Sequence, residues 1–177
     1  WVSPRGVNVV YSVILRPDRA RLSQVNMAAT LSVSKAVERC GGLTPSIKWP
    51  NDVRLRGRKI SGILVESALQ GSEVSHAVAG IGINVNFDTS LSPEIASTAT
   101  SIMVESGREA DRTEVLEVAL VYFDDLYQTV LSGGSLTAEW ANGLDTLGHT
   151  VRVEWQGRIV EGYAESVDEQ GNLMLKT

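Results

Sequence analysis

Residues 74–87 alternate between apolar and small or polar side chains, and this alternation constrains the fold more than any other part of the sequence. Side chains on a β-strand point alternately to its two faces, so the odd-numbered positions from Ala77 to Phe87 share one apolar face, which we expect to be core. The opposite face carries His76, Val78, Gly80, Gly82, Asn84 and Asn86. Glycine weakens a strand interior and often marks a place where something approaches the backbone closely. The pattern therefore predicts the floor of a ligand pocket; the alternative is a helix packed tightly over the glycines.

The residues just before this strand predict a β-hairpin. Residues 53–56 and 59–66 have the pattern of two strands, and Gly57 supplies the turn between them. A lysine at the mouth of an apolar strand face can reach a cleft while its stem stays packed, and its charge can stabilise a carboxylate or a phosphate. The alternative is an ordinary solvated lysine. By strand alternation, Lys59 is expected on the face of Ser61, Ile63 and Val65.

A polar run leads into this hairpin and adds a carboxylate and a carboxamide, in the order Lys48-Trp49-Pro50-Asn51-Asp52-Val53. Asp52 offers the hard oxygen that Mg²⁺ prefers, usually together with waters and substrate phosphates. The alternative is an Asx turn formed by Asn51 and Asp52 after the proline. Trp49 is expected to pack rather than to stack on a ligand. The run and the hairpin together predict a site for a small anionic ligand beside a metal–phosphate group.

Periodicity elsewhere predicts two long helices. Apolar residues recur at helical spacing over 19–39 and again after Asp111, which has the spacing of a capping box with Glu114. These patterns predict an α+β protein in which helices flank a mixed β-sheet. The remaining expected elements are a strand at 7–15, a surface loop at 88–100 and a shorter helix at 135–144.

The residue pattern changes near Gly148 from helical spacing to short strand-like runs. Three short strands with tight turns follow, which is typical of the beginning of a small β-barrel. We therefore expect two domains, residues 1–147 and an incomplete second domain at residues 148–177.

Composition excludes several classes of protein. A net charge of −5 and a pI near 5.1 argue against a nucleic-acid surface on this chain, which would show a basic stripe. No apolar run is long enough to span a bilayer. Cys40 is the only cysteine, so an internal disulfide framework is excluded, and a reducing, cytoplasmic compartment is expected. His76 and His149 lie far apart without a cysteine nearby, which makes a zinc site improbable.

Taken together, these motifs resemble the biotin protein ligase family. The resemblance extends over nearly the whole chain and implies a biotin/lipoate ligase-like fold, related to class II synthetases, followed by part of an SH3-like domain. The stretches that carry it are Lys48 to Val53, Lys59-Ile60-Ser61-Gly62-Ile63-Leu64-Val65-Glu66, Gly80-Ile81-Gly82-Ile83-Asn84-Val85-Asn86 and Ala99-Thr100-Ser101-Ile102.

The resemblance implies a two-step reaction in which biotin and Mg-ATP give biotinyl-5′-adenylate, and the acyl group then passes to a lysine of the biotin carboxyl carrier protein of acetyl-CoA carboxylase. Lys59 would bridge the biotin carboxylate and the α-phosphate. The resemblance is also compatible with a homodimer. The other implied contacts are Gly62, Gly80, Gly82 and Trp1 for biotin, Asn51, Asp52, Lys59 and Asn84 for ATP, and Asp52 and Asn84 for the metal.

The family's glycine- and arginine-rich adenylate loop would lie immediately before Trp1, outside this sequence. If the molecule starts at Trp1, we expect it to be catalytically crippled or unable to retain the adenylate; within a longer protein we expect full activity. The alternatives are a lipoate ligase-like enzyme, a biotin-responsive transcriptional regulator with an N-terminal DNA-binding domain, and a non-catalytic binding or assembly module. Trp49-Pro50 and Gly62-Ile63-Leu64 favour biotin over lipoate.

Overall fold

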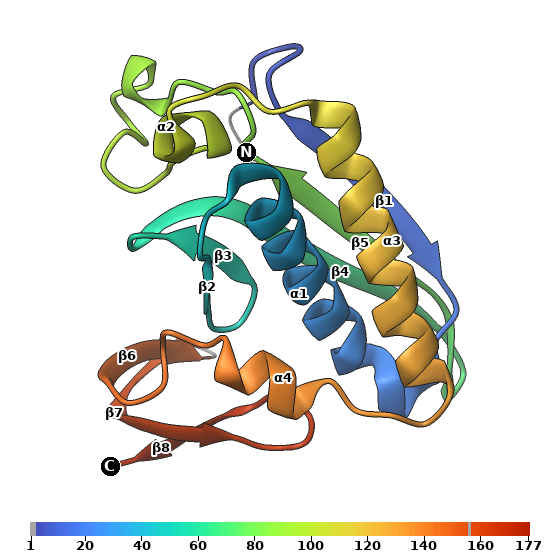
Figure 1. Cartoon of the computed structure of the whole chain (residues 1–177). Coiled ribbons are helices and arrows are strands. Elements are labelled where there is room, and N and C mark those ends of the chain that lie inside the picture. Colours follow the sequence, from blue (N-terminus) through green and yellow to red (C-terminus); the bar gives the residue numbers. More distant parts are fainter. Residues whose placement is uncertain (1–2, 156) are drawn as a thin grey trace.

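The computed structural model describes residues 3–155 and 157–177. Two sheets and the helices around them form the fold (Figure 1). In chain order the elements are β1 (Val9–Leu15), η1 (Arg19–Arg21), α1 (Leu22–Gly41), β2 (Ser46–Lys48), β3 (Asp52–Leu55), β4 (Arg58–Gln70), β5 (Glu73–Ile83), η2 (Thr89–Leu91), α2 (Ile102–Ser106), α3 (Arg112–Leu131), α4 (Thr137–Asn142), β6 (Thr150–Trp155), β7 (Arg158–Val167) and β8 (Leu173–Lys176).

The larger sheet has the strand order β1-β5-β4-β3-β2, and every strand pair in it is antiparallel. Helices α1 and α3 lie together on one face of this sheet (Figure 1). The expected α+β class with flanking helices is confirmed. The expectation of a mixed sheet is met only by two isolated parallel bridges among the described residues, Ile47 with Leu144 and Lys59 with Ala99.

The alternation of β5 determines which face is core. Ala77, Ala79, Ile81, Ile83, Val85 and Phe87 are all 5% exposed or less, which confirms the predicted apolar face. The predicted helix start at Asp111 is also confirmed, because its carboxylate accepts hydrogen bonds from the N–H groups of Thr113 (2.7 Å) and Glu114 (3.4 Å). Burying the apolar stripe of each helix against this face supplies the main driving force for the domain.

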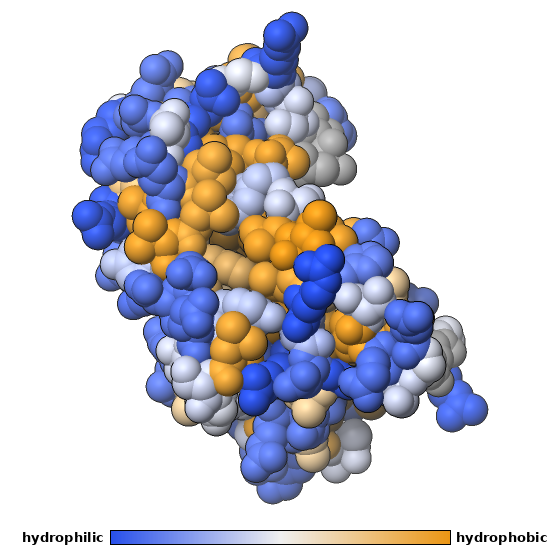
Figure 2. Space-filling view, turned by 90° about the vertical axis from the view of Figure 1, so that its right-hand side faces the viewer, coloured by the Kyte–Doolittle hydropathy of each residue, from blue (hydrophilic) through white to orange (hydrophobic). Residues whose placement is uncertain are grey.

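The opposite face of the same sheet is open. Val10, Ile14 and Leu64 lie on this face and are 60–66% exposed. The molecule shows a broad apolar surface, with a hollow in it, on the side where α3 and the edge strand β1 lie (Figure 2). A sheet face that is apolar and uncovered has room for a ligand.

The second sheet, β6-β7-β8, contacts Trp49 and Thr137 of the preceding part of the chain through the turn between β7 and β8. Asp168 closes this turn by accepting hydrogen bonds from Asn172, and these bonds hold the pKa of its carboxyl below the usual value. Gly171 has φ +80°, and a Cβ there would lie 2.7 Å from Met27 Cε, so only glycine fits without a shift. Trp49 Nε1 donates to Gly171 O at 2.9 Å, which confirms that this indole packs within the protein.

No helix among residues 3–155 and 157–177 is long and apolar enough to cross a membrane.

Candidate functional site

A strip without side chains crosses the open face of the sheet. Gly62 of β4 pairs with Gly82 of β5, and Gly80, two residues before Gly82, lies on the same face of the sheet. At Gly80 an added Cβ would meet only Leu64 O at 3.7 Å and Ser12 Oγ at 3.9 Å. Since no helix touches Gly80, the alternative of a helix packed over the glycines is wrong there. The floor is therefore bare at Gly80, as the alternation predicts, whereas Gly82 is buried.

Asp52 stands at one end of this strip, because it pairs with Gly62 across β3 and β4. Lys59 lies on the same face, and its Nζ is 2.6 Å from Asp52 Oδ1. The expected face for Lys59 is therefore wrong. A register shift between Val53 and Arg54 makes Lys59 pair with Arg54 although Ser61 pairs with Val53, so Ile60 is an extra residue in β4. This β-bulge reverses the alternation and brings Lys59 out of the face that α1 covers.

A cavity of about 580 Å³ adjoins the ion pair. Its described lining combines cations, one carboxylate, one carboxamide and a loop segment: Lys48, Asp52, Arg54, Gly57, Lys59, Asn84, Ile95, Ser97, Thr98 and Ala99. The Lys59 side chain is 39% exposed and that of Asp52 25%, so both reach the cavity without being buried. A positive and polar pocket beside a bare apolar floor suits a ligand with an anionic head and an apolar body.

Asn84 is held firmly at the inner end of this cavity. It is 5% exposed, its Oδ1 accepts from Asn8 Nδ2 at 3.2 Å, and its Nδ2 donates to Thr100 O at 3.0 Å. Asn51 is also held, because its Nδ2 donates to Ile63 O at 2.7 Å. Asn84 lines the cavity, whereas Asn51 is not among its described lining residues.

Some candidates lie elsewhere. Trp1, expected at the biotin site, lies outside the described residues. Asn86 is not at the pocket: its carboxamide binds both backbone groups of Ala110 at 2.9 Å and so fixes a loop. No group of three or more His, Cys, Asp or Glu side chains comes together in the described chain. A metal ion here would have to take most of its ligands from a substrate, as Mg²⁺ commonly does with phosphates.

The sequence places residues 97–100 in an expected surface loop, and although 99–102 belong to the family resemblance, their pairing with β4 was not expected. Lys59 N donates to Thr98 O and Thr100 N donates to Lys59 O, both at 2.8 Å, so the segment lies beside the start of β4 and forms an isolated parallel bridge with it. Thr100 is fully buried. The usable signal was Ser101 before an apolar run, since its side chain caps α2 by accepting from Val104 N at 3.1 Å.

Comparison with known proteins agrees with this geometry. Residues 1–84 match the sequence profile of the Biotin/lipoate A/B protein ligase family. The Bifunctional ligase/repressor BirA of Bacillus subtilis (strain 168) is 32% identical over 182 residues, which span all of this chain and 56% of that protein. The Biotin--[acetyl-CoA-carboxylase] ligase of Paracoccus denitrificans is 30% identical over 198 residues, covering 99% of this chain and 76% of that protein. The chain thus spans little more than half the length of the Bacillus relative.

Among solved structures, the biotin protein ligase from Aquifex aeolicus in complex with biotin and ATP is similar with a TM-score of 0.83 and 28% identity. The match covers 97% of this chain and 72% of that one.

Proposed function

The chain belongs to the biotin protein ligase family, and from this membership we propose that it activates biotin with ATP and transfers the biotinyl group to a lysine of a carrier domain. The observation that carries the proposal is the Lys59–Asp52 pair standing between a bare apolar floor and a polar cavity. The floor suits the apolar body of biotin, and the cavity suits a nucleotide. The pair lies where the two reacting groups would meet.

In the first step, an oxygen of the biotin carboxylate attacks the α-phosphorus of ATP, and pyrophosphate leaves. Negative charge grows on the α-phosphoryl oxygens as this happens. The Lys59 ammonium, held at 2.6 Å by the Asp52 carboxylate, stands ready to stabilise that charge without moving far. Holding the two substrates in one geometry supplies much of the remaining acceleration.

In the second step, the amine of a carrier lysine attacks the acyl carbon of biotinyl-5′-adenylate, and AMP leaves. The Paracoccus relative is named for acetyl-CoA carboxylase, so we propose the biotin carboxyl carrier protein of that enzyme as the partner. DNA binding is not proposed for this segment, because its net charge is −5. The homodimer and the cytoplasmic location stay predictions.

The residue assignments come from the family resemblance, and the position of Asp52, Lys59 and Asn84 at the cavity supports them in part. Gly62, Gly80 and Gly82 would form the floor under biotin, and Trp1 stays an expectation from the sequence. Asn51, Asp52, Lys59 and Asn84 would contact ATP. Asp52 and Asn84 offer oxygen donors that fit Mg²⁺ held mainly by substrate phosphates, where the ion would neutralise phosphate charge. We also propose residues 1–147 as the catalytic domain and 148–177 as part of an SH3-like domain, supported by the separate sheet β6-β7-β8.

The test is biotin-dependent exchange of labelled pyrophosphate into ATP by the purified protein in its native length. Exchange should require biotin and persist when lipoate is offered in excess. Incubation with a carrier domain should then add the mass of one biotinyl group. Exchange that depends on lipoate instead would make the chain a lipoate ligase, and binding without exchange would make it a non-catalytic module.

A further inference from the structure

We propose that Glu105 and Thr100 form a positioning pair that holds Lys59 and Asn84 in place for adenylation. This inference rests on the proposed function. It concerns two residues that act through others, because among the described residues neither Glu105 nor Thr100 lines the cavity. The pair lies beneath the cavity wall, at the start of α2.

The Glu105 carboxylate is a buried hub. Its side chain is only 2% exposed. Oε1 accepts from Arg58 Nη2 at 2.6 Å and from Thr100 Oγ1 at 2.8 Å, and Oε2 lies 3.4 Å from Arg56 Nη1. Hydrogen bonds to a buried carboxylate are among the strong ones in proteins. One side chain of α2 therefore fastens the tip of the β3–β4 hairpin to the segment 97–100.

Thr100 carries this anchorage to the site. Its hydroxyl binds Glu105, its N–H donates to Lys59 O at 2.8 Å, and its carbonyl accepts from Asn84 Nδ2 at 3.0 Å. Lys59 lies on β4 and Asn84 follows the end of β5, 25 positions further along, yet this one residue contacts both. A shift of Thr100 would move the proposed charge-stabilising ammonium and the proposed nucleotide-binding carboxamide together.

Arg58 completes the arrangement, because it precedes Lys59 in the chain. Its guanidinium binds Glu105 on one side while the Lys59 backbone pairs with Thr98 and Thr100 on the other. Loss of the Glu105 charge would leave two guanidinium groups without their carboxylate beside the site. The positions of the reacting groups are sensitive to this, since misplacement by about 1 Å can cost about 100-fold in rate.

The first test compares two substitutions of Thr100. Thr100→Ser keeps the hydroxyl that binds Glu105 but loses a methyl group, whereas Thr100→Val keeps the shape and loses the hydroxyl. A positioning role predicts that Thr100→Ser forms biotinyl-adenylate within about twofold of wild type, while kcat for Thr100→Val falls about 10- to 100-fold. A mere packing role predicts the reverse order. The Kd for biotin should stay unchanged in both variants, because the glycine floor is untouched.

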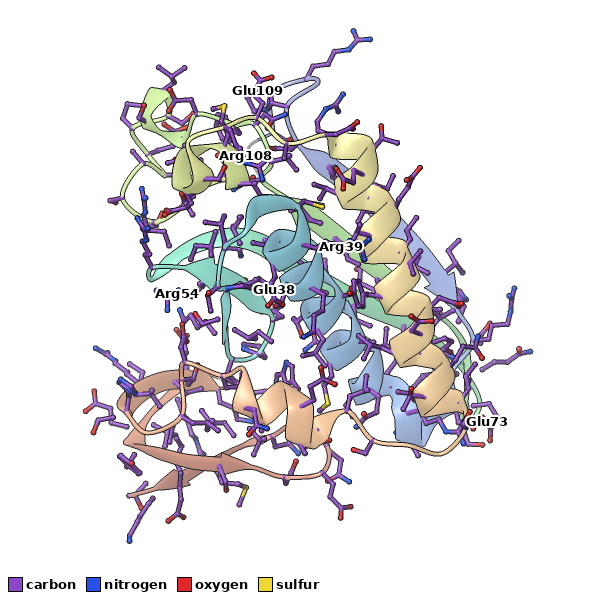
Figure 3. All side chains as sticks on the ribbon, viewed as in Figure 1. Glu38, Arg39, Arg54, Glu73, Arg108 and Glu109 are labelled. Atoms are coloured by element: carbon purple, nitrogen blue, oxygen red, sulfur yellow. The ribbon has the colours of Figure 1, made fainter. Side chains whose placement is uncertain are left out.

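The second test uses Glu105→Gln, with Glu109→Gln as its matched control. Glu109 lies in the loop between α2 and α3, is exposed, and points outward at the top of the molecule (Figure 3). Glu105→Gln should lower kcat about 10-fold or more and speed hydrogen exchange at the Lys59 and Thr100 amides, while Glu109→Gln should do neither. Should Thr100→Val fail to fold, Glu105→Gln carries the test alone, because glutamine keeps the shape of the side chain.

The outcomes separate the two claims. A wild-type protein that forms no biotinyl-adenylate refutes the proposed function, and the positioning role falls with it. An active wild type with Glu105→Gln and Thr100→Val equally active refutes the positioning role alone. Equal losses in Thr100→Ser and Thr100→Val would also refute it, since the hydroxyl would then not matter.

Discussion

Gly80→Ala separates ligand binding from folding at the bare floor of the site. The new Cβ would lie 3.7 Å from Leu64 O and 3.9 Å from Ser12 Oγ, which are ordinary van der Waals distances. The strand backbone can therefore accept alanine without strain. Glycine in a strand interior costs roughly 0.5–1 kcal/mol relative to alanine, so we expect Gly80→Ala to raise the free energy of unfolding by about that amount.

The same methyl group should harm binding. It would stand on the open face, where we propose that biotin lies against the backbone. Overfilling a fitted site costs about 1–3 kcal/mol, which corresponds to a loss of about five- to 150-fold in affinity. The variant should therefore be at least as stable as wild type and bind biotin more weakly.

Gly162→Ala is the matched control, since it is also a glycine inside a strand. Its Cβ would lie 3.0 Å from Lys176 O and 3.2 Å from Leu175 Cβ, in the β6-β7-β8 sheet. This crowding against backbone should destabilise the protein by about 1–3 kcal/mol while leaving biotin affinity unchanged. The two variants should thus show opposite patterns.

Urea denaturation measures the first quantity, and isothermal titration with biotin measures the second. The reasoning is refuted if Gly80→Ala loses more than about 1 kcal/mol of stability, because glycine would then be needed for packing. It is equally refuted if biotin affinity stays within twofold of wild type, because the ligand would then not lie on this floor.

Three further predictions concern other parts of the molecule. Lys59→Ala should lower biotin-dependent pyrophosphate exchange by at least about 100-fold with an unchanged circular dichroism spectrum, and surviving exchange would contradict the role given to Lys59. Trp49→Phe removes the hydrogen bond to Gly171 O, so limited proteolysis should release the C-terminal sheet faster than in wild type; equal rates would argue against this docking contact. Burial raises the pKa of Tyr11 far above its ordinary value of 10.0, and the hydroxyl has no partner among the described residues. Below pH 10 the phenol is neutral in both the folded and the unfolded chain, and above pH 10 ionisation of the unfolded chain lowers the free energy of unfolding. Tyr11→Phe should therefore flatten the alkaline fall in unfolding free energy. An unchanged fall would contradict this.

Periodicity suffices to predict the core of this protein. The odd-numbered residues of β5 are buried because burial of one strand face is a local consequence of alternation. The start of α3 is predictable for the same reason, since the Asp111 cap binds only its own next turn. The glycine floor follows from the other phase of the β5 pattern. In each case the outcome depends on residues only a few positions away in the sequence, or on the alternation of apolar and polar side chains within one strand.

The position of Lys59 is different, because it depends on the register between two strands. Alternation within β4 places Lys59 with Ser61, which is fully buried, but Ile60 is an extra residue and reverses the phase. Nothing in the composition of the strand marks the bulge. It is favourable because an ammonium directed into the face covered by α1 would be desolvated without a partner, whereas on the open face it meets Asp52. The electrostatic requirement of one residue thus overrides the regular pairing of the strand.

The bulge also explains why the segment after β5 is ordered into a strand-like path. Ile83 is the last residue of β5 to pair with β4, and Asn84 N still donates to Ile60 O at 2.8 Å. Beyond that point the N–H and C=O of Lys59 face away from β3 and need partners, since buried backbone groups are almost always hydrogen-bonded. Thr98 O and Thr100 N supply them. The segment 98–100 therefore pairs with the backbone of Lys59 in place of a strand. Thr100, which makes one of these hydrogen bonds, also contacts Asn84 and Glu105.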